Sequence, residues 1–163
     1  MNDTFFISDT HFGDKTICEY HPVHRPFSSI EEHDEELVRR WNGVVGKTDI
    51  VWHIGDFAVG SIAIAGRLNG KKHLILGNHD MRKPAEYAKY FERVFGMVRY
   101  QEPLFLLSHI PVHPAQLYQC KFNIHGHMHQ GEMPDDNRYF NVSCERINLT
   151  PMPYEELLNQ LQR

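Results

Sequence analysis

The sequence predicts a layered α/β fold in which at least some strands pair in parallel. Strand-like runs alternate with helix-like segments in the first half of the chain and crowd together in the second half. Such alternation is typical of sheets covered by helices and argues against an all-β barrel or a helical bundle. The chain has 163 residues and no internal repeat or linker-like tract, so one domain is expected over residues 1–163.

The expected elements follow from local patterns. Apolar and β-branched runs predict strands at residues 4–8, 50–54, 74–76, 94–100, 104–107, 121–125 and 139–144. Helical spacing predicts helices at residues 28–46, 61–68, 84–91 and 153–161. The longest helix opens with a capping box in which Ser28 or Ser29 faces a glutamate three residues later, and Trp41 lies on its core face. Residues 14–27 are expected to be irregular.

Five of these strand-like runs are followed by residues of the types that commonly bind metals. These candidate side chains are Asp9, His11, Asp56, Asn78, His79, Asp80, His109, His127 and His129. In open α/β sheets, ligands lie beyond the carboxyl ends of the strands, so we expect the nine side chains to converge in one cleft.

The donor set is too large for a single ion. Zinc-type sites use about four ligands and other cations about six, so two divalent metal ions are the natural interpretation. Nitrogen and oxygen donors without thiolate favour manganese, iron, zinc or nickel over magnesium, calcium or copper(I). Two cations about 3.5–4 Å apart can hold a hydroxide between them and clamp a phosphoryl group. This chemistry predicts in-line hydrolysis of a phosphate ester without a serine or cysteine nucleophile.

The ordered motifs resemble a known signature. Asp9-x-His11, Gly55-Asp56, Gly77-Asn78-His79-Asp80, His109 and Gly126-His127-x-His129 resemble the signature of the calcineurin-like metallophosphoesterases. The resemblance implies a four-layer α/β/β/α sandwich of two mixed β-sheets, with a dinuclear site at one edge. We expect two manganese ions at this site.

The resemblance also implies a role for each motif residue. One metal would be held by Asp9, His11 and His129, the other by Asn78, His109 and His127, with Asp56 as the bridge. His79 would assist the leaving group and Asp80 would orient His79. Asp14 departs from the histidine or asparagine that small bacterial members of the family lead us to expect there.

The leading functional hypothesis is a metal-dependent phosphoesterase that acts on a small soluble phosphodiester or phosphomonoester. A nuclease acting on short or single-stranded nucleic acid is an alternative, although the formal charge of −4 makes long duplex DNA a poor partner. A non-catalytic scaffold of the kind found in the retromer complex is an alternative of another class. Retention of His79 argues against the scaffold, because a scaffold needs no leaving-group acid.

Other features predict a soluble cytoplasmic protein. The three cysteines show no C-x-x-C spacing, which fits reduced thiols, and no apolar segment approaches the ~20 residues of a membrane span. No membrane partner is expected. Tyrosines and phenylalanines near residues 90–105 are expected to be exposed and to offer a face for a homodimer.

The remaining histidines and arginines receive structural interpretations. His53 and His125 are expected to be hydrogen-bonded in the core or behind a metal ligand. Surface positions are expected for His21, His24, His33 and His73, and for the loop arginines Arg25, Arg82 and Arg138. These arginines are also suited to binding phosphate oxygens, but a solvated position is favoured for each. His113 is expected to be a loop histidine or to touch substrate.

Overall fold

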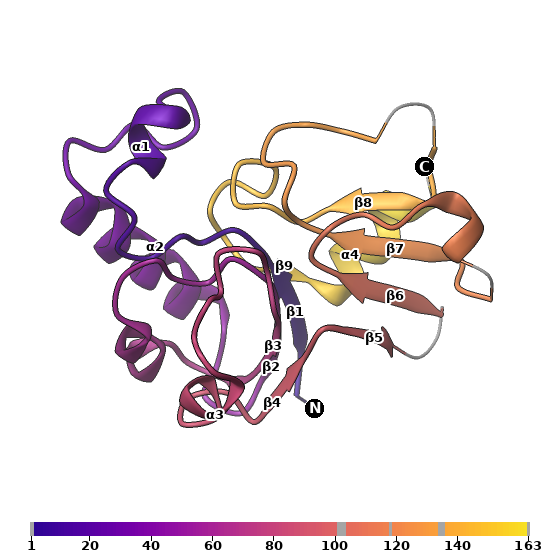
Figure 1. Ribbon diagram of the computed structural model, residues 1–163, viewed down its shortest axis with the longest axis horizontal. Coiled ribbons are helices and arrows are strands. Elements are labelled where there is room, and N and C mark those ends of the chain that lie inside the picture. Colours follow the sequence, from indigo (N-terminus) through magenta and orange to yellow (C-terminus); the bar gives the residue numbers. More distant parts are fainter. Residues whose placement is uncertain (1, 101–103, 118, 134–135, 163) are drawn as a thin grey trace.

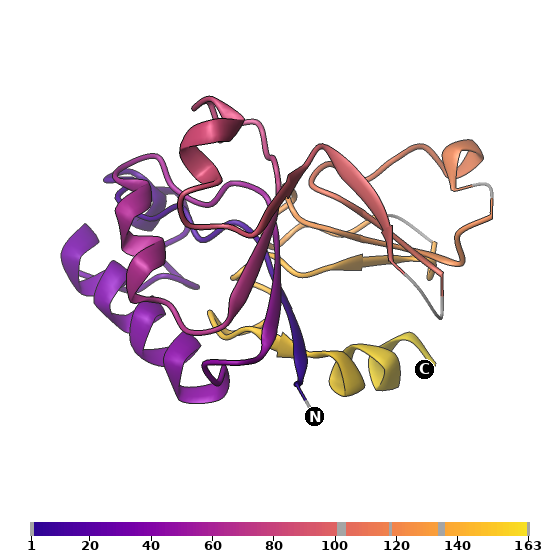
Figure 2. The same ribbon diagram turned by 90° about the horizontal axis from the view of Figure 1, so that it is seen from below.

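The computed structural model describes residues 2–100, 104–117, 119–133 and 136–162, and it contains two β-sheets flanked by helices (Figure 1). The sheets meet where β4 passes into β5 and then diverge (Figure 2). Helices α2 and α3 lie on the outer side of the first sheet, and α4 contacts β1 and β9 of that sheet and extends below the second. Each sheet contains both parallel and antiparallel pairs, which confirms the expected α/β fold of two mixed sheets.

The first sheet has the strand order β4-β3-β2-β1-β9. Its members are β1 (Thr4–Ile7), β2 (Ile50–Ile54), β3 (Lys71–Ile75), β4 (Arg93–Phe95) and β9 (Met152–Pro153). The first four strands run parallel, so their carboxyl ends share one edge, and β9 runs antiparallel to β1. The two-residue β9 is too short to show in the sequence pattern, and it lies outside the predicted strands.

The second sheet has the strand order β5-β6-β7-β8. Its members are β5 (Met97–Tyr100), β6 (Phe105–Ser108), β7 (Phe122–His125) and β8 (Tyr139–Asn141). The last three strands are parallel and β5 is antiparallel to β6. The single strand predicted for residues 94–100 is therefore wrong: the chain bends at Gly96, and the two halves join different sheets.

The four predicted helices are present with shorter bounds, and the structure adds two short ones, α1 and η2, that were not predicted. They are α1 (Ile17–Tyr20), α2 (Ile30–Val44), the 3-10 helix η1 (Ile62–Arg67), α3 (Pro84–Tyr87), the 3-10 helix η2 (Pro114–Gln116) and α4 (Tyr154–Leu161). Ser29 is the N-cap of α2, and its hydroxyl accepts a hydrogen bond from the Glu32 backbone at 3.1 Å. The Glu32 carboxylate in turn accepts from the Ser28 backbone, so both serines of the expected capping box contribute. The short α1 lies in the segment that was expected to be irregular.

The core joins the two sheets through aromatic contacts. The Tyr154 ring of α4 lies 6.3 Å from Phe6 of the first sheet and 6.1 Å from Phe105 of the second. Trp41 is buried as expected and donates its indole N–H to the Asn69 carbonyl. Tyr154 of α4 therefore packs against both sheets.

Among the histidines on helices and strands, two surface interpretations are wrong and two core interpretations are confirmed. His33 is fully buried and His73 packs on Trp52 with ring centroids 4.7 Å apart, so neither lies on the surface. The surface prediction failed because His33 on α2 and His73 on β3 lie on faces of these elements that point into the protein. His53 and His125 are buried and hydrogen-bonded, as expected.

The aromatic residues near positions 90–105 are not exposed. Phe91 and Phe105 are buried, while Tyr90, Phe95 and Tyr100 pack against the core. The basis for an aromatic dimer face is therefore wrong, and the homodimer itself stays a prediction. Within the described residues, no helix has the length and apolar character needed to span a membrane.

Candidate metal centre

The nine predicted side chains lie just beyond the carboxyl ends of β1, β2, β3, β6 and β7. Two groups of potential ligands form there, each with its donor atoms within 4.8 Å of one another. The first group is Asp9, His11 and His129, and the second is Asp56, His109 and His127. A further group of potential ligands, outside the predicted set, joins His21 and Glu145 to the same His129. Asn78 joins the second group, because its side-chain oxygen lies 3.1 Å from His109 Nε2 and 2.9 Å from His127 Nδ1.

Asp56 stands between the two groups. Its Oδ2 atom lies 3.6 Å from His11 Nε2 on one side and 3.2 Å from His109 Nε2 on the other. Burial alone would raise the pKa of Asp56, but the hydrogen bond and charge of His109 outweigh burial and lower it to about 2. Asp56 is therefore an ionised carboxylate at neutral pH, placed so that one oxygen faces both groups.

Buried donor atoms without protein partners test whether a cation fits the first group. Asp9 Oδ1 and His11 Nε2 are buried, face each other at 3.9 Å, and have no hydrogen-bond partner among the described residues. Burial lowers the pKa of His11 to about 4, so its ring is neutral. His11 Nδ1 lies 3.2 Å from the Asp14 carboxylate, which places the proton on Nδ1 and the lone pair on Nε2. A carboxylate and an imidazole lone pair that face each other suit a cation.

His109 supplies the same test for the second group. Its Nδ1 lies 2.9 Å from the Ile54 carbonyl oxygen, so this nitrogen carries a proton. The other nitrogen then faces two further oxygen acceptors, those of Asp56 and Asn78. Burial alone would lower the pKa of His109, but the carboxylates of Asp56 and Asp9 raise it, so this nitrogen accommodates positive charge. Either a second ring proton or a bound cation satisfies the arrangement, and the second group is compatible with a metal.

The candidate ligands carry strained backbone. Positive φ angles occur at Asp9 (56°), His11 (49°), Asp56 (55°), His127 (68°) and His129 (49°). Among the described residues that are not glycine, just two others share this conformation. Each such residue costs on the order of 1–3 kcal/mol and persists where the surrounding structure holds it, which is common at functional sites. The strain in this chain is concentrated at the candidate metal centre.

Two motif glycines allow the loops to approach the carboxylates. A Cβ atom on Gly77 would collide with the carboxylate and backbone nitrogen of Asp56, and one on Gly126 would collide with Ser8 Oγ and Asp9 Oδ2. Neither glycine has a positive φ angle. Glycine is required at both positions because of close packing against the acidic ligands.

A buried ion pair that the sequence analysis missed supports the first ligand group. Arg25 is fully buried, donates to the carbonyl oxygens of Asp9 (2.5 Å) and Thr10 (3.2 Å), and pairs through Nε with Glu145 at 2.7 Å. The same Glu145 oxygen lies 3.0 Å from His129 Nδ1. Burial alone would raise the pKa of Glu145, but His129 and Arg25 lower it well below its usual range. Arg25 and Glu145 thus hold the strained Asp9 loop and orient His129.

The surface interpretation of Arg25 is therefore wrong, whereas Arg82 and Arg138 are exposed as expected. Arg25 and Glu145 are 120 positions apart, and neither lies in a local motif that indicates the pair. His21 is half-buried and stacks on His129 with ring centroids 4.3 Å apart, which also differs from a surface position. His24 and His113 are exposed, and His113 Nδ1 accepts from the Ala115 backbone as a loop residue does.

Replacing Arg25 by methionine is expected to destabilise the protein by about 3–5 kcal/mol, because Glu145 is left buried without its charge partner. Manganese affinity should also fall about 10- to 100-fold, since Glu145 no longer orients His129 firmly. Urea unfolding and manganese titration measure the two effects. Arg67→Met is the matched control: Arg67 is 49% exposed and pairs with Glu35, so its loss should cost less than about 1 kcal/mol. Equal stability of the two variants would contradict the assigned role of Arg25.

His79 and Asp80 differ in how they relate to the site. The exposed His79 ring lies 5.1 Å from the His11 ring, and its backbone N–H donates to Asp56 Oδ1 at 2.8 Å. The expected contact between the Asp80 carboxylate and the His79 ring is not found among the described hydrogen bonds. Its carboxylate accepts from the backbone N–H groups of Asp56, Phe57 and Gly77. Asp80 therefore ties the loops after β2 and β3 together and acts on His79 only through the backbone.

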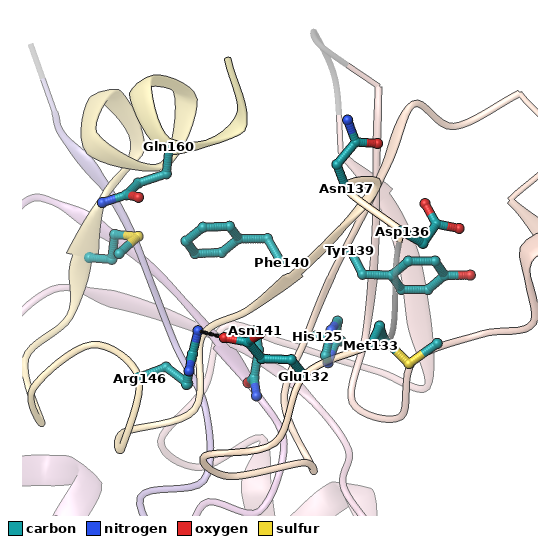
Figure 3. Close-up of a pocket in the computed structure, with 11 residues that line it drawn as sticks. His125, Glu132, Met133, Asp136, Asn137, Tyr139, Phe140, Asn141, Arg146 and Gln160 are labelled. Carbon is teal, nitrogen blue, oxygen red and sulfur yellow. Dashed lines mark hydrogen bonds and ion pairs between the residues drawn. The ribbon is translucent and has the colours of Figure 1, made fainter. Parts of the chain in front are cut away.

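A separate cavity of about 730 Å³ lies between β8, α4 and the segment that follows His129 (Figure 3). Its charged lining residues have partners, since Arg146 pairs with Glu132 across the cavity and Asp136 pairs with Arg138. None of the nine candidate side chains lines it. The cavity contacts the metal centre indirectly, through Asn141, which donates to the carbonyl oxygens of His129 and Gly131.

The two mixed sheets, with carboxylate and imidazole groups adjoining at their strand ends, define an α/β protein with candidate metal-binding groups. The chain belongs to the calcineurin-like phosphoesterase superfamily, whose domain model matches residues 3–145. Membership of this family and the clusters of aspartate and histidine side chains together support divalent metal binding.

Similar proteins occur in an archaeon, a phage and a bacterium. The chain is 31% identical to an uncharacterized protein of Methanocaldococcus jannaschii, with 100% of this chain and 93% of that protein covered. It is 34% identical to the gene 66 protein of Mycobacterium phage L5 over 79% of this chain and 78% of that protein. A crystal structure of a protein of unknown function from Aquifex aeolicus superposes with a TM-score of 0.81 at 24% identity, covering 98% and 99% of the two chains. This last similarity shows the fold.

Proposed function

We propose that the protein is a metal-dependent phosphoesterase that hydrolyses a phosphodiester or phosphomonoester. The observation that supports this most is the position of Asp56, whose one oxygen faces His11 and His109 in two separate ligand groups. Two adjoining cation sites that share a carboxylate are suited to holding the attacking and leaving oxygens of a phosphoryl group.

The first ion would be held by the group that contains Asp9, and the second by the group that contains Asn78. Manganese is the proposed metal, and iron, zinc or nickel would suit the same nitrogen and oxygen donors. Bound divalent cations supply an activated water nucleophile and neutralise charge on the phosphoryl oxygens. The chain's own contribution is to fix the donors, which it does through Asp14 on His11, Ile54 on His109 and Glu145 on His129.

His79 is the proposed proton donor to the leaving oxygen. Its ring is exposed at the site, and none of the hydrogen bonds between described residues involves that ring. The backbone bond to Asp56 Oδ1 keeps His79 at a fixed position relative to the shared carboxylate. An imidazole held beside the reacting phosphorus in this way is suited to giving a proton to a poor alkoxide leaving group.

A substrate screen with manganese-loaded protein tests the proposed function. The screen should include aryl phosphodiesters and monoesters, cyclic nucleotides, dinucleotides, glycerophosphodiesters and a short single-stranded oligonucleotide. Hydrolysis of at least one ester that disappears on chelation and returns with manganese is the expected result. Absence of metal-dependent hydrolysis across the whole set would contradict the proposal and favour a non-catalytic scaffold.

A further inference from the structure

An apolar groove adjoins the second ligand group. It has a volume of about 440 Å³ and lies among the segment after β3, the bend between β4 and β5, and the segment after β6. Asn78 and His109 form part of its lining, and Leu76, Met97, Ile110 and Val112 supply apolar side chains. The groove is therefore continuous with the candidate metal centre and is not a separate surface feature.

The chemistry of the groove restricts what it can bind. No aspartate, glutamate, lysine or arginine is among the described residues that line it. Met97 is 60% exposed and Ile110 is 52% exposed, so large apolar surface faces solvent beside a polar centre. Covering such surface with an apolar group is favourable, whereas placing a charged group there without a partner is costly.

We propose that this groove binds the uncharged apolar or aromatic organic group of the phosphate ester, while the phosphoryl group lies at the metal centre. The inference rests on the proposed function and narrows its substrate class. Esters with a flat or aliphatic group next to the phosphorus are accepted, and compounds with further phosphates or carboxylates at that position are rejected. Specificity then depends on the residues around the bend at Gly96.

Gly96 offers a way to fill the groove without disturbing the fold. A Cβ atom added there meets nothing within 4 Å, and the residue has no positive φ angle. Gly96→Leu should therefore fold normally and occupy part of the groove. Gly43→Leu is the matched control, because Gly43 also has open space around an added Cβ and lies on the exposed face of α2, away from the groove.

Two esters with the same leaving group and charge distinguish an effect on the groove from an effect on the reaction centre. For bis(p-nitrophenyl) phosphate, Gly96→Leu should lower kcat/KM about tenfold or more, as expected for loss of an apolar pocket contact. For methyl p-nitrophenyl phosphate, kcat/KM should stay within about twofold of the wild-type value, because a methyl group uses little of the groove. An equal loss for both esters, or no loss for either, would overturn the inference.

A binding measurement keeps the inference distinct from the proposed function. In zinc-loaded protein with labelled methyl groups, phenylphosphonate should shift the resonances of Met97 and Ile110, whereas methylphosphonate should not. If these shifts occur but no ester is hydrolysed, the groove assignment stands and the hydrolase proposal fails. If esters are hydrolysed and phenylphosphonate leaves both methyl resonances unmoved, the groove assignment falls. Shifts that follow protein concentration without the phosphonate would assign the groove to a contact between copies of the chain and would also overturn it.

Discussion

Replacing Asp56 by asparagine is expected to deplete both metal ions and to abolish metal-dependent hydrolysis. The carboxylate faces His11 Nε2 and His109 Nε2 with a single oxygen, and its low pKa keeps it charged at neutral pH. Asparagine has nearly the same shape but places a neutral amide there. Two bound cations would supply several kcal/mol of transition-state stabilisation, so their loss should lower the rate by about 10³-fold or more.

Elemental analysis after manganese loading and gel filtration measures the metal content, and hydrolysis of an aryl phosphodiester measures the rate. Asp136→Asn is the control of the same chemical change, because Asp136 belongs to neither ligand group and pairs with the exposed Arg138. The control should keep both metal and activity. Full metal content in Asp56→Asn would contradict the assignment of Asp56 as the shared ligand.

His79→Ala is expected to separate metal binding from catalysis. The His79 ring belongs to neither ligand group, so metal content should remain near that of the wild type. Hydrolysis should nevertheless fall by about 10²-fold or more, which is the usual size of general acid catalysis. The loss should be larger for an alkyl leaving group than for p-nitrophenol, because the alkoxide has the greater need of a proton.

The comparison of two leaving groups tests the chemical role of His79 directly. A uniform loss across leaving groups would point to substrate positioning and not to proton donation. Metal loss in His79→Ala equal to that in Asp56→Asn would contradict the separation of roles. Circular dichroism of each variant shows whether the fold is retained, which is expected because His79 is exposed.

The sequence predicted those features that depend on residues close together in the chain. Strand ends were readable because an apolar run, a glycine and a metal-type side chain stand next to one another, as at residues 74–80. Parallel pairing of β1, β2 and β3 then brings their ends to one edge, so placement of the candidate ligands follows from the topology.

Features that depend on distant partners could not be read in the same way. The burial of Arg25 is made favourable by Glu145, which lies near the other end of the chain, and no periodic pattern encodes that pair. Asp80 was assigned to its neighbour in sequence, His79, but the fold offers its carboxylate three backbone N–H groups instead. The division of residues 94–100 between two sheets likewise depends on tertiary pairing, because β4 and β5 read locally as one strand.

Metal stoichiometry tests the central claim most directly. Manganese-loaded wild-type protein, freed of unbound metal, should contain two ions per chain, and its activity should follow occupancy of both. The clustering of donors into two groups joined by Asp56 predicts this result. An active protein that saturates at one ion per chain, or hydrolysis that persists without bound metal, would contradict the dinuclear account.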